Sequence, residues 1–359
     1  MAGTCYKEYS FKNAWNRFVF YTSYYPFSLP SVFPIWVAHF YKKYISNVIF
    51  IEYNNECLFP IIKKHLCGCV RFMQVLIGKE IYYMPLYFKE RLNENPANIT
   101  EYFISQNKKW DILRVHYARQ CDMIQSKIQM LNNNIPFFEL STRRVAVIYI
   151  HGTFDEYLEK VCSKKDIKET LRIKRKAEKE RQVEYKIYAG ANVTHGLAEA
   201  YDVSTRSWKA LEKTNIGGDN IYGAFYRDIF AALSDKITVH IISFNNKPVS
   251  FTITCVHEGT CFIMKTGYDM EYKNYRLGGM VFYNTLQYVF SQKNIKKIDF
   301  ITDYSYLKTW VNEYEIYQSF IAFNKTIAGL VSYVLLKCCY LVKKRAGLIW
   351  NRCFKRSIT

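Results

Sequence analysis

Lys265-Thr266-Gly267-Tyr268-Asp269 and the nearby Tyr275-Arg276-Leu277-Gly278-Gly279-Met280 are the stretches that decide the fold of this chain. An apolar run, residues 260–264, ends at the first stretch, and residues 281–290 read as a helix after the second. A strand, a loop and a helix N-terminus in this order make an anion site, because the first helical N–H groups are unpaired and the helix dipole favours negative charge. A cofactor diphosphate would suit such a site, although Gly-Gly before a helix is also the mark of a plain turn.

The composition indicates a folded, basic protein with two domains. The chain has 359 residues, of which 50% are hydrophobic and 17% aromatic, so a disordered chain is excluded. The formal net charge is +19, from 50 Lys and Arg against 31 Asp and Glu. This excess favours a phosphate-bearing cofactor, an anionic membrane, nucleic acid or an acidic carrier protein. A lysine-rich composition from an A/T-biased genome explains the same charge without any partner.

The cysteines and the N-terminus indicate a reducing compartment. Cys67-Gly68-Cys69 and Cys338-Cys339 lack the Cys-x2-Cys spacing and His partners of a zinc site. The first ten residues are polar, and the apolar stretch 18–33 is broken by Pro26 and Pro30, so we expect no signal peptide. We therefore expect reduced thiols, no metal and a cytoplasmic location.

Residues 1–140 read as a mixed α/β unit. Apolar runs predict strands at 48–53, 57–62, 70–77, 80–84 and 112–117, and Thr100 caps a helix that continues through Lys109.

The rest of the chain gives a more specific order of elements. A strand at 145–150 precedes a capping box formed by Thr153 and Glu156. The patterns then predict, in order, a helical region through 181, helices at 193–211 and 221–233, a hairpin of 237–244 with 249–256, a strand at 260–268, a helix at 281–291 and a strand at 297–301.

A run of cations marks the helical region before residue 181. Its members are Lys164, Lys165, Lys168, Arg172, Lys174, Arg175, Lys176, Lys179 and Arg181. They fit either a solvated helix face or a basic arm over an anionic substrate.

Six short motifs occur along this order of elements. They are Ser163-Lys164-Lys165, Arg206-Ser207-Trp208-Lys209, Asn246-Lys247-Pro248-Val249, Thr266-Gly267-Tyr268-Asp269, Tyr275 with Gly278, and Asp299-Phe300 with Tyr306, Lys308 and Trp310. Together they resemble the GNAT (N-acetyltransferase) superfamily, and more closely the acetyltransferase branch of polysaccharide-biosynthesis proteins related to the Fem peptidyl transferases.

The resemblance implies an α/β (α+β) fold of two tandem GNAT-like domains, each a mixed, mostly antiparallel sheet flanked by helices, followed by a C-terminal amphipathic helix. We expect a degenerate first domain at 1–140, an acyltransferase domain at 141–320 and a basic tail at 321–359. The superfamily's diphosphate loop reads Arg/Gln-x-x-Gly-x-Gly/Ala. Here Tyr275 and Met280 depart from that pattern.

The resemblance also implies roles for named residues. In GNAT proteins the fourth strand splays from the fifth, and the thioester of an acyl-CoA enters that gap. The residues implied for the cofactor are Tyr268, Tyr275, Arg276, Leu277, Gly278, Gly279 and Met280. The candidate general bases are Asp269, Asp299 and Asp303, and Tyr306 is the candidate acid for the departing thiolate. The candidate substrate-binding residues are Lys168, Arg172, Arg206, Trp208, Lys308 and Trp310.

The C-terminal tail contains an apolar stretch at 327–342 that is short for a membrane span and is followed by cations. This pattern suits a helix lying on an anionic membrane surface through 327–356, at the inner face of the membrane. Packing against the first domain is the alternative.

These patterns lead to three functional hypotheses. The first is an N-acyltransferase that uses acetyl-CoA or another acyl-CoA, without a metal, on an amine such as an amino sugar of a surface glycan or glycolipid. The second is a Fem-like transferase that takes an aminoacyl group from tRNA, with an acyl carrier protein as a further possible donor. The third is a degenerate, membrane-associated binding protein.

Overall fold

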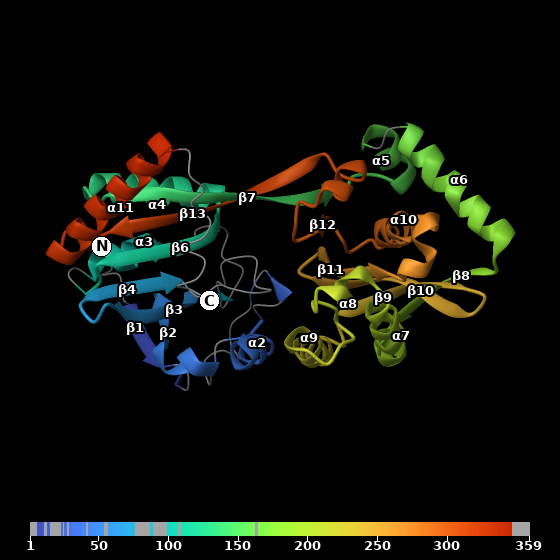
Figure 1. Ribbon diagram of the computed structural model, residues 1–359, viewed down its shortest axis with the longest axis horizontal. Coiled ribbons are helices and arrows are strands. Elements are labelled where there is room, and N and C mark those ends of the chain that lie inside the picture. Colours follow the sequence, from blue (N-terminus) through green and yellow to red (C-terminus); the bar gives the residue numbers. More distant parts are fainter. Residues whose placement is uncertain are drawn as a thin grey trace.

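The computed structural model describes residues 6–10, 13–14, 23, 25–26, 29–40, 42–53, 57–75, 87–88, 99–106, 109–161 and 164–346. They form two lobes that two long strands connect (Figure 1). The expected strand at 80–84, Ser163 and the expected membrane-surface segment beyond residue 346 lie outside the described residues.

The first lobe is built mainly from the first part of the chain. Its elements are β1 (Tyr6–Ser10), α2 (Phe33–Phe40), the 3₁₀ helix η2 (Lys42–Asn47), β2 (Val48–Tyr53), β3 (Cys57–Leu66), β4 (Val70–Val75), β5 (Tyr87–Phe88), α3 (Ile99–Ser105), β6 (Ile112–Arg119) and α4 (Gln120–Asn132).

The second lobe and the return to the first follow in order. These elements are β7 (Phe137–Tyr149), α5 (Phe154–Val161), α6 (Lys164–Glu180), β8 (Val183–Ala189), η3 (Gly190–Asn192), α7 (Val193–Thr205), α8 (Trp208–Leu211), α9 (Ile221–Ala232), β9 (Ile237–Phe244), β10 (Lys247–His257), β11 (Thr260–Tyr268), η4 (Met270–Tyr275), α10 (Leu277–Phe290), β12 (Lys297–Asp299), η5 (Ser305–Thr309), β13 (Glu313–Phe323) and α11 (Ile327–Ala346).

One sheet runs through both lobes. Its order is β1-β2-β3-β4-β6-β13-β7-β12-β11-β10-β9-β8, with β5 paired to β3 beside this path. The pairs β4–β6 and β11–β12 are parallel, whereas the hairpins around them are antiparallel. This mixed, mostly antiparallel sheet with flanking helices confirms the predicted α/β (α+β) class.

The two lobes repeat one pattern of strands. In the first, β4 pairs in parallel with β6 over Phe72–Gln74 and Ile112–Arg114. In the second, β11 pairs in parallel with β12 over Thr260–Phe262 and Lys297–Asp299. A helix precedes the second strand of each pair, α3 in one lobe and α10 in the other. Each lobe therefore contains a short parallel pair of strands, and in each the second strand of the pair follows a helix.

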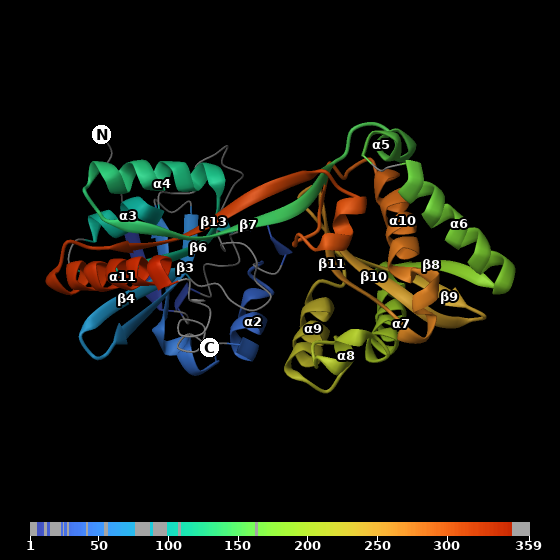
Figure 2. The ribbon, with the colours of Figure 1, turned by 45° about the horizontal axis from the view of Figure 1, so that its top comes forward.

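Two long strands are shared between the lobes (Figure 2). β7 follows the first lobe in the chain, but it pairs with β12 of the second. β13 follows the second lobe, but it pairs with β6 of the first, and β7 and β13 pair with each other. Both predicted domain boundaries, after residues 140 and 320, fall inside these strands, because each lobe receives a strand from outside its own stretch of chain.

The central strands β9 and β10 of the second lobe are buried on both sides because helices cover both faces of the sheet (Figure 1). On one face, Val239 and Ile253 belong to a core with residues of α7 and α9 such as Val203 and Ile229. On the other face, Ile242, Phe244 and Val249 pack with Leu277 and Val281 of α10 and with Ile173 and Ala177 of α6. The turn into α10 is thereby fixed on the sheet.

The structure refines several predicted elements. The predicted helix at 193–211 is divided at Arg206 into α7 and α8, and α10 begins at Leu277 rather than at 281. The predicted strand at 145–150 begins at Phe137. The sequence patterns missed α4, β8 and β13.

The C-terminal helix α11 packs against the first lobe. Tyr333 stacks on Phe138 with ring centroids 5.1 Å apart and meets the edge of Phe323 at 5.6 Å. Among the described residues, no helix has both the length and the apolar character needed to cross a membrane.

Candidate active site

The turn into α10 leaves helix amides available. Arg276 takes the left-handed conformation, φ 46° and ψ 44°, immediately before Leu277 starts the helix. The amides of Gly279 and Met280 donate back to the carbonyl of Arg276, at 2.9 and 3.4 Å. No side chain of the described residues caps the helix, and the amides of Leu277 and Gly278 have no hydrogen-bond partner there. These two N–H groups carry the positive end of the helix dipole.

The two glycines of this turn face open space. A Cβ added to Gly278 would meet no heavy atom within 4 Å, and one added to Gly279 would meet only Cζ2 of Trp310, at 3.9 Å. Gly267 differs, because its Cβ would lie 2.6 Å from the ring of Phe251. Gly267 therefore serves packing inside the sheet, whereas Gly278 and Gly279 leave room for a ligand.

A pocket of about 210 Å³ lies at this turn. Its lining comes from three elements, with Thr170 and Ile173 from α6, Arg276, Gly279 and Met280 from the turn and α10, and Tyr306, Thr309 and Trp310 from η5 and the residue after it. Five of these lining residues were predicted to belong to the site. Arg276, Gly279 and Met280 were predicted to bind the cofactor, Tyr306 to be catalytic and Trp310 to bind the substrate. The fold brings them together although they lie in two separate parts of the sequence.

The strands beside the pocket separate. β11 pairs with β12 only over Thr260–Phe262, whereas it stays paired with β10 as far as Tyr268. From Ile263 onward, one edge of β11 therefore has no strand beside it among the described residues. This is the splay expected from the GNAT resemblance, and it leaves backbone groups of β11 available to a carbonyl oxygen.

The exposed side of α6 carries a cationic ridge, defined here as Lys165, Lys168, Arg172, Arg175 and Lys179. Alternating steps of three and four residues place these exposed side chains on one face of the helix. Arg172 pairs with Glu169 at 2.8 Å, whereas the other four have no ion pair in the described structure. The ridge is about 21 Å long. Thr170 and Ile173 of the same helix line the pocket, so the ridge runs beside the pocket.

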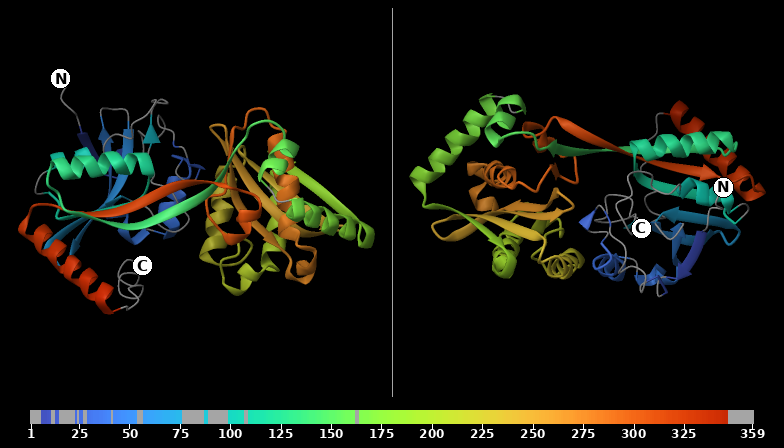
Figure 3. Two further views of the ribbon diagram at one scale, coloured as in Figure 1. Left: turned by 90° about the horizontal axis from the view of Figure 1, so that it is seen from above. Right: turned by 180° about the vertical axis from the view of Figure 1, so that it is seen from behind.

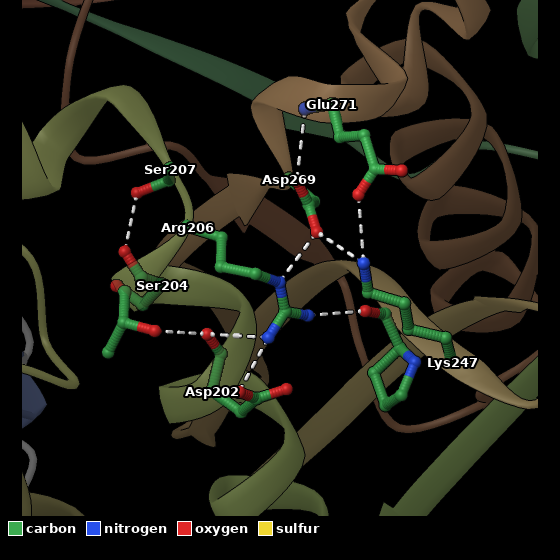
Figure 4. A network of polar contacts seen from close by, with 9 residues as sticks. Asp202, Ser204, Arg206, Ser207, Lys247, Asp269 and Glu271 are labelled. Carbon is green, nitrogen blue, oxygen red and sulfur yellow. Dashed lines mark hydrogen bonds and ion pairs between the residues drawn. The ribbon is translucent and has the colours of Figure 1, made fainter.

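Asp269 is held in a network of cations and amides (Figure 4). Its Oδ2 accepts from Nε of Arg206 at 2.6 Å and lies 3.6 Å from Nζ of Lys247, and its Oδ1 accepts from the N–H of Glu271 at 3.0 Å. Burial alone would raise the pKa of this carboxyl, but Arg206 and the Glu271 N–H outweigh it and lower the pKa. A low pKa and two occupied oxygens suit a structural cap better than a base.

The guanidinium of Arg206 bonds to other groups of the protein. Each of its three nitrogens donates to a protein oxygen, on Asp269, Asp202 or Pro248. The guanidinium thus joins the end of α7, the start of β10 and the end of β11 (Figure 4). This arrangement supports the turn into α10 and leaves no nitrogen of Arg206 dedicated to a substrate.

The other two candidate bases differ in their surroundings. Asp299 is 2% exposed, accepts from the N–H of Ile301 at 2.8 Å and lies 3.4 Å from Nζ of Lys297. Asp303 lies 3.6 Å from Nε of Arg144, and its Oδ1 is buried without a hydrogen-bond partner in the described chain. Of the three carboxylates, Asp303 is the one with an oxygen that has no hydrogen-bond partner among the described residues, and like the other two it lies outside the pocket lining.

Tyr306 lies at the pocket between two aromatic rings. Its ring stacks with Phe282 at 5.9 Å and with Tyr304 at 5.8 Å. The side chain remains 47% exposed, yet desolvation, with Tyr304 adding a smaller effect, raises the pKa of the phenol to about 12. At this pKa, as at the ordinary value near 10, the phenol is protonated at neutral pH and able to donate a proton.

The remaining predicted residues lie outside the pocket lining. Tyr268 and Tyr275 pack against the core below α10, and the hydroxyl of Tyr275 donates to Glu180 at 2.6 Å. Leu277 is fully buried and contributes its amide rather than its side chain. Trp208 is 41% exposed on α8, and Lys308 is exposed on η5.

Three lining residues were not predicted, namely Thr170, Ile173 and Thr309. The helical spacing of Ile173 and Ala177 already marks the buried side of α6, so this side could have been identified as the wall of a site.

Comparisons with known proteins agree with this geometry. Residues 165–309 match the model of the acetyltransferase (GNAT) domain. No curated protein is significantly similar in sequence to the chain.

Two solved structures share the fold over most of the chain. A conserved protein of unknown function from Bacteroides thetaiotaomicron has 12% sequence identity and a TM-score of 0.54, over 90% of this chain and 100% of its own. FemX has 9% identity and a TM-score of 0.51, over 92% of this chain and 99% of its own. The chain therefore shares the fold of these two structures, and residues 165–309, which hold the pocket and the splayed strands, match the GNAT acetyltransferase domain.

Proposed function

We propose that the chain is an N-acyltransferase that moves an acyl group from acyl-CoA to an amine. The observation that carries the proposal is the start of α10, where no described side chain caps the helix and the amides of Leu277 and Gly278 have no described partner beside an open pocket. A diphosphate fits such a start because it accepts several N–H bonds and its charge opposes the helix dipole. The charge of Arg276, which lines the same pocket, adds to this attraction.

The splay of β11 from β12 supports a place for the thioester. Beyond Phe262, the free edge of β11 is available to the carbonyl oxygen of the acyl group. Backbone N–H groups at this edge would stabilise the oxyanion of the tetrahedral intermediate. Acetyl-CoA is the proposed donor because the family model that matches is that of an acetyltransferase domain.

The reaction needs one proton acceptor and one proton donor. The neutral amine attacks the thioester carbon, the new C–N bond forms, and the C–S bond breaks. Asp303, directly or through water, takes the proton that the amine loses, and Tyr306 gives a proton to the thiolate. Asp303 has the unpartnered oxygen for this role, and Tyr306 has the protonated hydroxyl at the pocket.

An amino sugar is the proposed acceptor class, in the assembly of a surface glycan or glycolipid. The two aromatic residues of the pocket lining, Tyr306 and Trp310, support this choice, because sugar rings pack on aromatic side chains.

Two measurements test the proposal. Titration calorimetry should show binding of CoA, and incubation with acetyl-CoA and a panel of amino sugars should release free thiol in proportion to the acylated amine. Absence of CoA binding at millimolar ligand would overturn the proposal. CoA binding without thiol release on any amine would favour the degenerate binding protein instead.

The cationic ridge on α6 supports a second candidate donor. Four cations that have no ion pair with any described residue, on one helix face beside the pocket, suit a polyanion better than a single diphosphate. Aminoacyl-tRNA and an acidic acyl carrier protein are donors of this kind. Binding of tRNA through several phosphates would weaken steeply with salt, whereas weak binding with a flat salt dependence would exclude the tRNA donor.

A further inference from the structure

The C-terminal helix α11 has two apolar faces, and only one of them is covered. Tyr333 and Leu336 belong to a cluster with Phe72, Ile321 and Phe323 on the sheet of the first lobe. The start of the helix is also fixed, because Oγ1 of Thr326 donates to Asp111 at 2.5 Å and accepts from the N–H of Gly329 at 3.0 Å. The helix is therefore anchored to the lobe along one side.

The opposite face of α11 is apolar and exposed. Ile327, Val331, Val334 and Leu335 are exposed by 85, 52, 54 and 61%, and Leu330 by 44%. Their spacing of three and four residues forms a single stripe along the helix, and Cys338 continues it. A soluble monomer rarely exposes so continuous an apolar stripe, which marks a site of contact with another apolar phase or surface. Figure 3 shows α11 at the outer side of the first lobe.

The charged residues of the chain segment that carries this stripe all have the same sign. After Glu315 the sequence contains no Asp or Glu, but it contains eight Lys and Arg. Lys337 lies on α11 beside the stripe, and the backbone of the helix continues through Lys343, Lys344 and Arg345. A protein partner with an apolar groove would not need this excess of positive charge, whereas anionic lipid matches both the apolar stripe and the cations.

We propose that α11 lies in the plane of an anionic membrane surface, with the stripe from Ile327 to Leu335 in the boundary between headgroups and acyl chains. The helix is about 30 Å long, and its other face stays on the protein, so it binds along the surface rather than across the bilayer. Binding holds the first lobe, and with it the whole protein, at the membrane. This inference does not depend on the proposed acyl transfer.

Vesicle binding of the full-length protein tests the inference. We expect co-sedimentation with vesicles of phosphatidylcholine and phosphatidylglycerol, weakened by salt, and little binding to phosphatidylcholine alone. The double variant Val334→Gln/Leu335→Gln should bind the anionic vesicles about tenfold more weakly, because it removes two apolar side chains from the boundary. Both positions are already exposed, so folding and CoA binding should not change.

Leu211→Gln is the matched control, since Leu211 is an exposed apolar residue, at 87%, on α8 of the other lobe. This variant should bind vesicles like the unchanged protein. Equal binding of the double variant and the unchanged protein to anionic vesicles would overturn the proposal. So would a concentration-dependent dimer that the double variant abolishes, with no vesicle binding, because the stripe would then be the contact between two copies of this chain.

Discussion

Arg206 donates from Nε to Oδ2 of Asp269 across 2.6 Å, and this contact joins the end of α7 to the turn that leads into α10. Asp269 caps η4, which leads into the glycine turn, and neither residue of the pair belongs to the pocket lining. It therefore positions the amides of the turn without touching the ligand they would bind.

Asp269→Asn separates a structural role from a role as base. Because Asp269 is 3% exposed and paired, its loss of charge should lower the free energy of unfolding by about 2 kcal/mol. The pKa is lowered in the folded protein, so this contribution is present at neutral pH and is lost as the pH falls below about 4. Urea unfolding and steady-state kinetics together check the assignment. A large loss of kcat at unchanged stability would instead identify Asp269 as the base.

Gly278→Glu should separate ligand binding from helix stability. The carboxylate stands in the first turn of α10, where it favours the helix dipole, and Glu has a higher helix propensity than Gly. The free energy of unfolding should therefore rise by about 1 kcal/mol. CoA binding should weaken at least about tenfold relative to Gly278→Gln, which has the same size without the charge. Calorimetry and thermal unfolding provide the two readouts. Equal CoA affinity of the two variants would place the diphosphate elsewhere.

Arg276 combines a strained backbone with a charge at the pocket. Its positive φ costs about 1 kcal/mol for a residue with a Cβ, so Arg276→Gly should raise the free energy of unfolding by about this amount. The same variant should weaken CoA binding about tenfold because a charged hydrogen-bond donor is lost. Arg276→Ala keeps the strain and should share only the loss of binding. Unchanged CoA affinity in both variants would show that the guanidinium faces solvent.

Asp303→Asn should reduce kcat by about a hundredfold and leave CoA binding unchanged, because it removes the proposed general base. The matched control is Asp299→Asn. Asp299 is buried beside Lys297, so its substitution should mainly lower the free energy of unfolding and should change the rate of the chemical step much less. Pre-steady-state thiol release and urea unfolding distinguish the two. If Asp303→Asn retains full kcat, another group or water takes the proton.

Asp111 should make the first lobe sensitive to acid. Burial would raise the pKa of its carboxyl, but hydrogen bonds from Arg71 and Thr326 lower it to about 2. The stabilisation is complete above about pH 4 and is lost toward pH 2, which amounts to about 2 kcal/mol. Asp111→Asn should lack this part of the acid response, as measured by urea unfolding against pH.

The control for Asp111 is Glu139→Gln. Glu139 pairs with Lys127, and 55% of its side chain is exposed. Loss of this exposed pair should change stability by less than about 1 kcal/mol. An equal acid response of the Asp111 and Glu139 variants would argue against the buried pair as the source.

Much of the second lobe could be predicted from the sequence because its signals are local. Thr153 and Glu156 form the predicted reciprocal capping box, with the N–H of Thr153 donating to Glu156 and the N–H of Glu156 donating to Oγ1 of Thr153. The hairpin of β9 and β10 and the glycine turn are also encoded within a few residues.

The missed features depend on partners far apart in the sequence. β13 carries Glu313 and Glu315 among its apolar residues, and it becomes a central strand only because β6 and β7, more than a hundred residues earlier, lie on its two sides. The same limit applies to the carboxylates. In the sequence alone Asp269 resembles a base. The structure shows that its carboxylate accepts a hydrogen bond from Arg206, which lies 63 residues away in the chain. Local patterns do not contain this information.

The exchange of β7 and β13 fixes the order in which the protein can mature during its synthesis. The first lobe lacks the second neighbour of β6 until Phe323 has left the ribosome, because β13 is the last strand among the described residues. One edge of β6 therefore keeps unpaired N–H and C=O groups while the entire second lobe is translated. A chain that stops after the second lobe's own residues would leave this edge open and prone to association with other chains. Completion of β13 is thus the step that joins β6 of the first lobe to β7, the strand that pairs with the second lobe.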